Sequence, residues 1–258
     1  MESETVNASM QQTEEIKPVN FFSRLGGVYT SPGATFKEIG GSPRVLVPII
    51  ALVIISMIAG FVLSLKVDLG SLMTQGAEQA VATGRMTQQQ MEQQMAIMSK
   101  LGPIILTIGS AFQTLFLTLI IAAVFKLISV LIGAQNQFKG VFSVTTFVMI
   151  AILVVQSIVF IAILFSKNPA ELDATSLNSL VASNLGALWT GIFGEDSLPK
   201  FLMKLFGWVD IFAIWAIALL SIGYAAVSRK LKTSTAATWI VSIYGIIAII
   251  GSLIASRR

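Results

Sequence analysis

The side chains that could carry chemistry in this chain are few, and three polar ones lie inside long apolar stretches. Asp210 is the only carboxylate in any of the long apolar runs, and Gln113 and Gln156 are side-chain amides in two other runs. An acid at membrane depth is a candidate for lining a polar path or for binding a partner. In the alternative interpretation, Asp210 lies at interfacial depth near a helix N-terminus, where the helix dipole favours a negative charge. Three aromatic residues follow or precede it and form a predicted collar: Trp208, Phe212 and Trp215.

The residue types that the chain lacks limit its chemistry further. It has no cysteine and no histidine, which removes disulfides, thiolate nucleophiles, imidazole metal ligands and the Ser-His-Asp triad. An intramembrane aspartyl protease needs two facing acids, and the apolar runs hold one. We therefore expect no catalytic residues, no cofactor and no metal site, and we interpret the protein as a non-enzyme.

The composition indicates the setting in which these side chains lie. Of 258 residues, 55% are hydrophobic and only 12% are charged, and about 20 consecutive apolar residues suffice for a helix to cross a bilayer. The net charge of +4 fits loops anchored at a membrane better than a nucleic-acid partner. The fold class is therefore an all-α polytopic integral membrane protein with five transmembrane helices and short interfacial amphipathic helices. The predicted spans are about 45–65, 103–126, 141–165, 205–228 and 239–255.

The segments before the first span have a different character. Residues 1–19 are polar and acidic without periodicity, and we predict a disordered N-terminal tail. Residues 20–44 contain two short apolar faces separated by Ser31 and Pro32, a helix cap followed by proline at the first helical position. This pattern predicts short helices at the cytoplasmic interface, leading into a membrane domain over residues 45–256.

Two patterns predict how the spans pack. Ser56, Gly60 and Ser64 recur every four residues on the first span, a strip of small residues that lets another helix approach closely. Gln113 and Gln156 on neighbouring spans are able to hydrogen-bond each other, which is worth about 1 kcal/mol or less in membranes. We expect these amides to act as glue between helices, with a substrate path as the alternative.

The long loop after the first span contains a helix of its own. Thr87 and Gln90 form a capping box at its start. Methionines then follow at helical spacing on one face: Met91, Met95 and Met98. Such a face either covers the bundle or the lipid surface, or serves as an adaptable surface for a partner, because methionine tolerates varied shapes.

Basic residues in the short links predict the orientation. The links at 135–139 and 229–232 carry basic side chains and no acid, whereas the two long loops mix both signs. Since basic short links stay inside, we expect an N-terminus in the cytoplasm, a C-terminus outside and residence in the cell (cytoplasmic or inner) membrane.

With this layout the chain resembles the Ypt/Rab-interacting membrane protein (YIP) family, in its bacterial branch. The resemblance covers roughly residues 21–255 and includes the five-span layout itself. Three stretches carry it: the lead FFSRLGGVYTSPGATFKEIGGSPRVLVPII, the Gln/Met-rich MTQQQMEQQMAIM, and WVDIFAIWAIALLSIGYAAVSRKLK, which is similar to the family's Asp-x-Phe-x-x-Trp span through Asp210, Phe212 and Trp215.

The resemblance implies an N-cytoplasmic membrane domain of five helices and no catalytic residues. Eukaryotic members are implicated in Rab GTPase binding, but this sequence lacks their Asp-Leu-Tyr-Gly-Pro type of motif. Some bacterial members look like accessory components beside export pumps. We therefore expect a scaffold or accessory subunit of a membrane transport, export or trafficking complex, which contacts the lipid bilayer and either a membrane-protein partner, such as an export-pump subunit, or a second copy of itself. The alternative is a small transporter or channel with a path lined by Asp210, Gln113 and Gln156.

Overall fold

Helices make up nearly all of the chain that the computed structural model describes, which is residues 20–65, 69–166, 183–194 and 197–257. The predicted tail at residues 1–19 lies outside these ranges. The helices are α1 (Phe21–Thr30), α2 (Pro32–Gly41), α3 (Leu46–Ser64), α4 (Leu69–Ala82), α5 (Gln88–Leu131), α6 (Phe138–Ser166), α8 (Leu185–Phe193), α9 (Lys200–Gly207), α10 (Ile211–Val227) and α11 (Thr233–Ser256).

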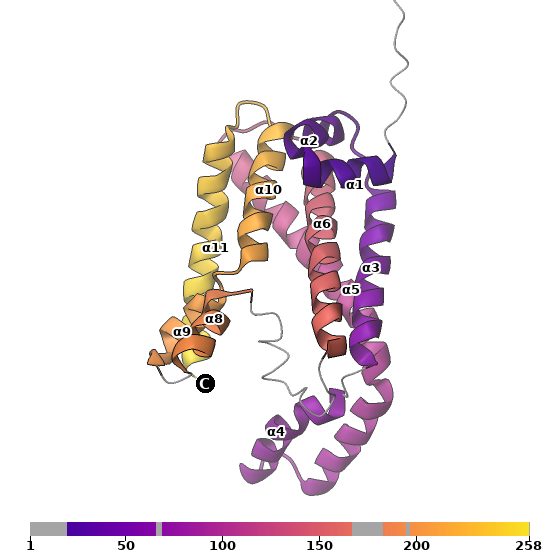
Figure 1. Ribbon diagram of the computed structural model, residues 1–258, viewed down its shortest axis with the longest axis vertical. Coiled ribbons are helices and arrows are strands. Elements are labelled where there is room, and N and C mark those ends of the chain that lie inside the picture. The colour runs from indigo at the N-terminus through magenta and orange to yellow at the C-terminus, as the bar shows by residue number, and fades with distance from the viewer. Residues whose placement is uncertain (1–19, 66–68, 167–182, 195–196, 258) are drawn as a thin grey trace, which may run out of the picture.

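Five of these helices run between two opposite ends of the molecule and alternate in direction (Figure 1). Helices α3, α5, α6 and α11 are long and apolar enough to cross a membrane, and α10 is a shorter apolar helix of 17 residues. Helices α1 and α2 lie at one end. Helices α8 and α9, and the hairpin that α4 forms with the start of α5, lie at the other. The prediction of an all-α polytopic membrane protein is confirmed.

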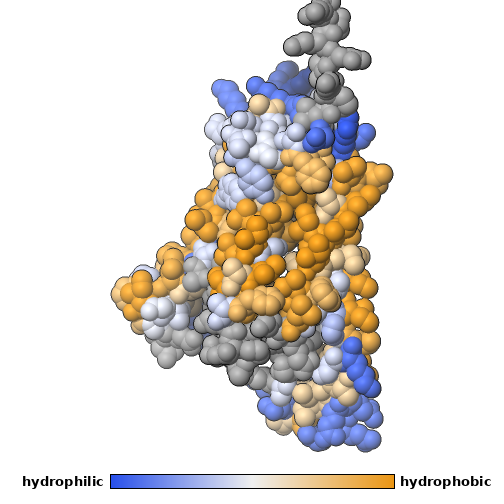
Figure 2. All heavy atoms as spheres, turned by 45° about the vertical axis from the view of Figure 1, so that its right-hand side comes forward, coloured by the Kyte–Doolittle hydropathy of each residue, from blue (hydrophilic) through white to orange (hydrophobic). Residues whose placement is uncertain are grey.

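The surface has the polarity that a bilayer requires. On the face that Figure 2 shows, an apolar belt crosses the middle of the molecule, between hydrophilic residues at both ends. Large side chains on this belt are exposed on every long helix, among them Ile54, Phe112, Ile158 and Ile250. Contact with lipid tails stabilises such a surface, whereas water would not.

The second span differs from its predicted form because it does not begin at Pro103. A capping box of Thr87 and Gln90 starts α5, with hydrogen bonds of 2.8 and 3.2 Å in the two directions, and the helix then continues for 44 residues through Pro103. Residues 88–102 contain no sequence that stops a helix, and membrane helices tolerate proline. The Met-rich helix and the second span are thus one element.

The two N-terminal helices pack onto the bundle. Phe36 and Ile39 of α2 and Val28 of α1 are fully buried, in a core that they share with α6 and α10. Gly223 of α10 makes room for them, because a Cβ there would overlap Val144 and stand 3.3 Å from the Phe36 ring. The apolar faces predicted for the interface are therefore part of the protein core.

An ion pair fixes the two helices to each other. The Arg24 side chain is only 2% exposed, and its Nη2 lies 2.9 Å from Oε1 of Glu38 on α2. Its Nη1 donates to the Ser42 carbonyl oxygen at 3.0 Å, just beyond the end of α2. These contacts stabilise the buried Arg24 side chain, because a buried guanidinium without partners is strongly unfavourable.

Candidate functional site

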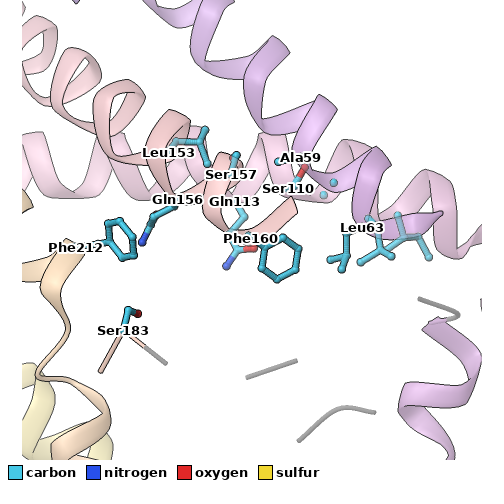
Figure 3. A pocket seen from close by; sticks show the side chains of 14 residues that line it. Ala59, Leu63, Ser110, Gln113, Leu153, Gln156, Ser157, Phe160, Ser183 and Phe212 are labelled. Carbon is cyan, nitrogen blue, oxygen red and sulfur yellow. The ribbon is translucent and has the colours of Figure 1, made fainter. Parts of the chain in front are cut away.

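A cavity of about 590 Å³ lies among the helices that carry most of the predicted site residues (Figure 3). Helices α3, α5 and α6 supply most of its wall, and Ser183 and Phe212 approach from the opposite side. Apolar and polar side chains share the lining: Ala59, Gly60, Leu63, Ile105, Leu106, Gly109, Ser110, Gln113, Leu153, Gln156, Ser157, Phe160, Ser183 and Phe212. The cavity is thus amphiphilic and lies among helices that cross the membrane.

The small-residue strip of α3 allows α3 and α5 to pack closely against each other. A Cβ on Gly60 would overlap the Leu106 carbonyl oxygen, so only glycine allows this contact. The Ser110 hydroxyl donates to the backbone oxygen of Ser56 at 2.7 Å. Ser64 does not take part, because its hydroxyl donates back to the Phe61 carbonyl of its own helix at 2.7 Å. Two of the three predicted strip residues therefore form the contact.

Both predicted glutamines line the cavity. Gln113 projects from α5 and is exposed, and Gln156 projects from α6 and is half-buried. Within the described residues, neither amide makes a hydrogen bond, so the predicted bond between them is not formed. Among the residues that the structure describes, the donors and acceptors of the two amides are therefore unpaired at the cavity wall.

Asp210 has a well-defined structural role. It is the N-cap of α10, and its Oδ1 accepts hydrogen bonds from the backbone amides of Phe212 at 2.8 Å and Ala213 at 3.1 Å. The Ser183 hydroxyl donates to the other oxygen, Oδ2. Asp210 thus lies at a helix N-terminus, while its depth in the membrane and its functional role stay predictions. Ser183 connects it to the cavity wall.

This cap marks a break that the predicted span 205–228 did not contain. Helix α9 ends at Gly207, and α10 begins at Ile211. Remote residues satisfy two carbonyl groups of the break: the Trp208 carbonyl accepts from the Tyr244 hydroxyl at 2.7 Å, and the Val209 carbonyl accepts from the Leu185 amide at 2.8 Å. A backbone break in a membrane protein persists only where such partners exist. Hydropathy alone does not detect the break, because one acid within a long apolar run changes the mean hydropathy little.

The predicted aromatic collar around Asp210 is distributed over three contacts. Trp208 packs edge-on against Tyr244, with ring centroids 5.7 Å apart. Trp215 lies 5.9 Å from the ring of Tyr29, whose hydroxyl donates to the Ala151 carbonyl at 2.9 Å. Burial raises the pKa of the Tyr29 hydroxyl, so it stays protonated and able to donate this bond. Phe212 alone of the three lines the cavity.

The methionine face of α5 lies against α4. Met91 is buried, and Met95 and Met98 line a smaller cavity of about 330 Å³ with Met73 and Met86. The face that we predicted as a partner surface is thus covered in part by the preceding helix. Its role toward a partner stays a prediction.

Sequence reasoning missed several members of these sites. Ser157, Phe160 and Ser183 line the main cavity, and Arg24 with Glu38 holds the N-terminal helices. The signal for Phe160 was available, since it lies four residues after Gln156 and so on the same helix face. In the described ranges, no cluster of three or more acidic, histidine or cysteine side chains is able to hold a metal ion.

Comparison with known proteins gives one match. The family described as Yip1 domain matches residues 26–255, which is nearly the whole described structure. No curated protein and no solved structure matches the chain.

Proposed function

The chain belongs to the Yip1 domain family, and from this premise we propose that it is a non-enzymatic scaffold or accessory subunit of a membrane transport, export or trafficking complex. In this proposal it resides in the cell (cytoplasmic or inner) membrane, with the α1–α2 end in the cytoplasm and the C-terminus outside. The short links with basic residues at the α1–α2 end support this orientation.

The observation that carries the proposal is the pair of free amides in the cavity. Gln113 and Gln156 line an amphiphilic cavity among spanning helices and have no hydrogen-bond partner in the described chain. Lipid tails offer no donors or acceptors, and a polar group without a partner in hydrocarbon is unfavourable. A transmembrane segment of another protein, with a polar side chain at that depth, satisfies both amides.

The shape of the cavity supports a helical partner. Its polar groups alternate with Phe160, Phe212 and Leu153, which suit the apolar flank of a helix. The partner is either another membrane protein, such as an export-pump subunit, or a second copy of this chain. Both have the same requirement for a polar side chain facing the amides.

The experiment is recovery of the tagged protein from its native membrane in mild detergent, followed by mass spectrometry. We expect stoichiometric recovery of one membrane protein with the wild type and a clear loss with Gln156→Leu. The matched control is Gln79→Leu on the exposed face of α4, which makes the same chemical change away from the cavity. A second copy of the chain is detected by co-expressing a differently tagged copy and testing for its recovery. Recovery of neither another membrane protein nor the second copy, or equal recovery with both variants, contradicts the proposal.

A small transporter or channel is the second candidate. One observation favours it: Gln113 and Gln156 share the cavity with Ser183, which contacts Asp210. The test is flux through reconstituted protein with Asp210→Asn. Asparagine also caps helices well, so this variant removes the charge and keeps the fold. Loss of flux in a folded variant favours transport, and unchanged flux removes the carboxylate from any path.

A further inference from the structure

A second cavity, of about 450 Å³, lies at the α1–α2 end, where three short links of the chain converge. These are the α2–α3 link, the α5–α6 turn and the α10–α11 link. Polar groups and glycines form most of its wall: Gly40, Gly41, Pro43, Gln135, Asn136, Gln137, Gly140, Val227 and Arg229. No residue of the intramembrane site takes part in it.

Hydrogen bonds hold the wall of this cavity in place. The Lys126 ammonium donates to the backbone oxygen of Asn136 at 2.7 Å and to its Oδ1 at 3.0 Å. The Asn136 amide then donates to the Ser228 hydroxyl at 2.8 Å. Next to it, the Arg229 backbone amide donates to the Gln135 carbonyl at 2.8 Å. The α5–α6 turn and the α10–α11 link thus form one preorganised frame.

Within the described part of the chain, the positive charge of the frame has no carboxylate partner. Lys126 is half-buried, and its acceptors are neutral oxygens. Arg229 lines the cavity, and within the described residues its guanidinium makes no hydrogen bond or ion pair. The single carboxylate at this end of the described chain, Glu38, is already held by Arg24. Further cations lie on the same end: Lys37, Arg44, Lys139, Lys230 and Lys232.

We propose that this cavity binds the phosphate group of an anionic phospholipid headgroup. Arg229 lines the cavity, and the Lys126 ammonium is bound to Asn136, another lining residue. A guanidinium favours a phosphate ligand, because charge-assisted hydrogen bonds to phosphate are the strong ones. The cavity lies where α2 and α10 end and α6 begins, and this is the level of headgroups because the apolar belt starts directly below. A lipid, unlike a soluble anion, is anchored at that depth by its acyl chains.

The inference is independent of the proposed function, since it concerns other residues and another ligand. The test compares purified protein exposed to equal amounts of phosphatidylglycerol and phosphatidylcholine in mixed micelles. Native mass spectrometry then counts the lipids that each protein retains. We expect the wild type to retain phosphatidylglycerol in preference to phosphatidylcholine, and Arg229→Gln to lose about fivefold in that preference, as for one basic residue at an anionic surface.

Two variants distinguish a specific binding site from a general effect of the protein's net charge. Lys204→Gln removes an exposed cation at the opposite end and is expected to leave the preference unchanged. Gly41→Glu inserts a carboxylate into the cavity at a position where a Cβ meets nothing within 4 Å, and we expect it to abolish the preference. Equal losses with Lys204→Gln and Arg229→Gln overturn the proposal, because the effect then reflects net charge alone.

Inorganic phosphate tests whether the cavity binds a lipid headgroup or a soluble anion. Added to the same micelles, it is expected to displace little of the retained phosphatidylglycerol, because the acyl chains contribute to binding. If phosphate abolishes the preference, so that the protein retains phosphatidylglycerol and phosphatidylcholine equally, the result contradicts a lipid site and assigns the cavity to a soluble anion.

Discussion

Substitutions at Asp210 test the structure most directly, because they separate the hydrogen bonds that cap α10 from the negative charge of the side chain. Asp210→Ala removes the acceptor of two backbone amides and the partner of Ser183. Loss of an N-cap costs about 1–2 kcal/mol, and loss of one hydrogen bond about 1 kcal/mol, so the variant is expected to lose about 2–3 kcal/mol. Asp210→Asn keeps the capping oxygen, and the Ser183 hydroxyl is able to rotate and accept from the new amide. It loses only the interaction with the helix dipole, about 0.5 kcal/mol.

Thermal unfolding in mild detergent, followed by tryptophan fluorescence, measures the difference. Trp208 and Trp215 lie on the two sides of the cap, so their emission reports on this break. At about 2–4 °C for each kcal/mol in a chain of this length, we expect Tm to fall by about 5–10 °C with alanine and by about 1–2 °C with asparagine. Equal losses refute the capping argument and indicate that the charge itself stabilises the fold. No loss with alanine indicates that the α9–α10 break does not depend on its cap.

Three further predictions concern the contacts between helices. Gly60→Ala is expected to lower Tm by several degrees in the same assay, because the new methyl group overlaps the Leu106 carbonyl and forces α3 away from α5; an unchanged Tm is evidence against this close approach. Ser56→Ala is expected to leave Tm within about 2 °C, since its buried hydroxyl has no hydrogen-bond partner, and a large loss contradicts that assignment. Arg24→Met is expected to cost about 2–3 kcal/mol, because it removes the charge-assisted bonds to Glu38, whose side chain is 34% exposed, and the bond to the Ser42 carbonyl. The loss is measured as faster proteolysis of the N-terminal helices, and the double variant with Glu38→Gln recovers part of it if the ion pair is the cause.

The sequence was informative wherever a pattern acts through neighbours along the chain. The capping box at Thr87 and Gln90 needs only local contacts and was predicted correctly. Apolar runs long enough to cross a bilayer identified the spanning helices, because burial in lipid depends on composition rather than on a particular partner. The small-residue strip was right at Ser56 and Gly60 for the same reason, since glycine spacing on one helix allows approach by any other.

Features that depend on distant segments were not predictable in this way. The break before α10 exists because Leu185 and Tyr244, remote in sequence, satisfy its backbone. The second span was predicted from Pro103 because the apolar run begins there, and the capping box was assigned to a separate loop helix, whereas the structure joins the two in one helix. The two glutamines were correctly placed on neighbouring helices, but their side chains face a shared cavity and do not reach each other.

The unbroken α5 helix has a mechanical consequence. At 1.5 Å per residue, its 44 residues extend about 66 Å, roughly twice the thickness of the hydrocarbon layer. One end carries the methionine face beside α4, and the middle carries Ser110 and Gln113 into the intramembrane cavity. Pro103, which has no backbone N–H, lies between these two parts and is the position at which the helix is able to bend. The outer methionine face and the cavity wall thus belong to one continuous helix that holds a single proline between them.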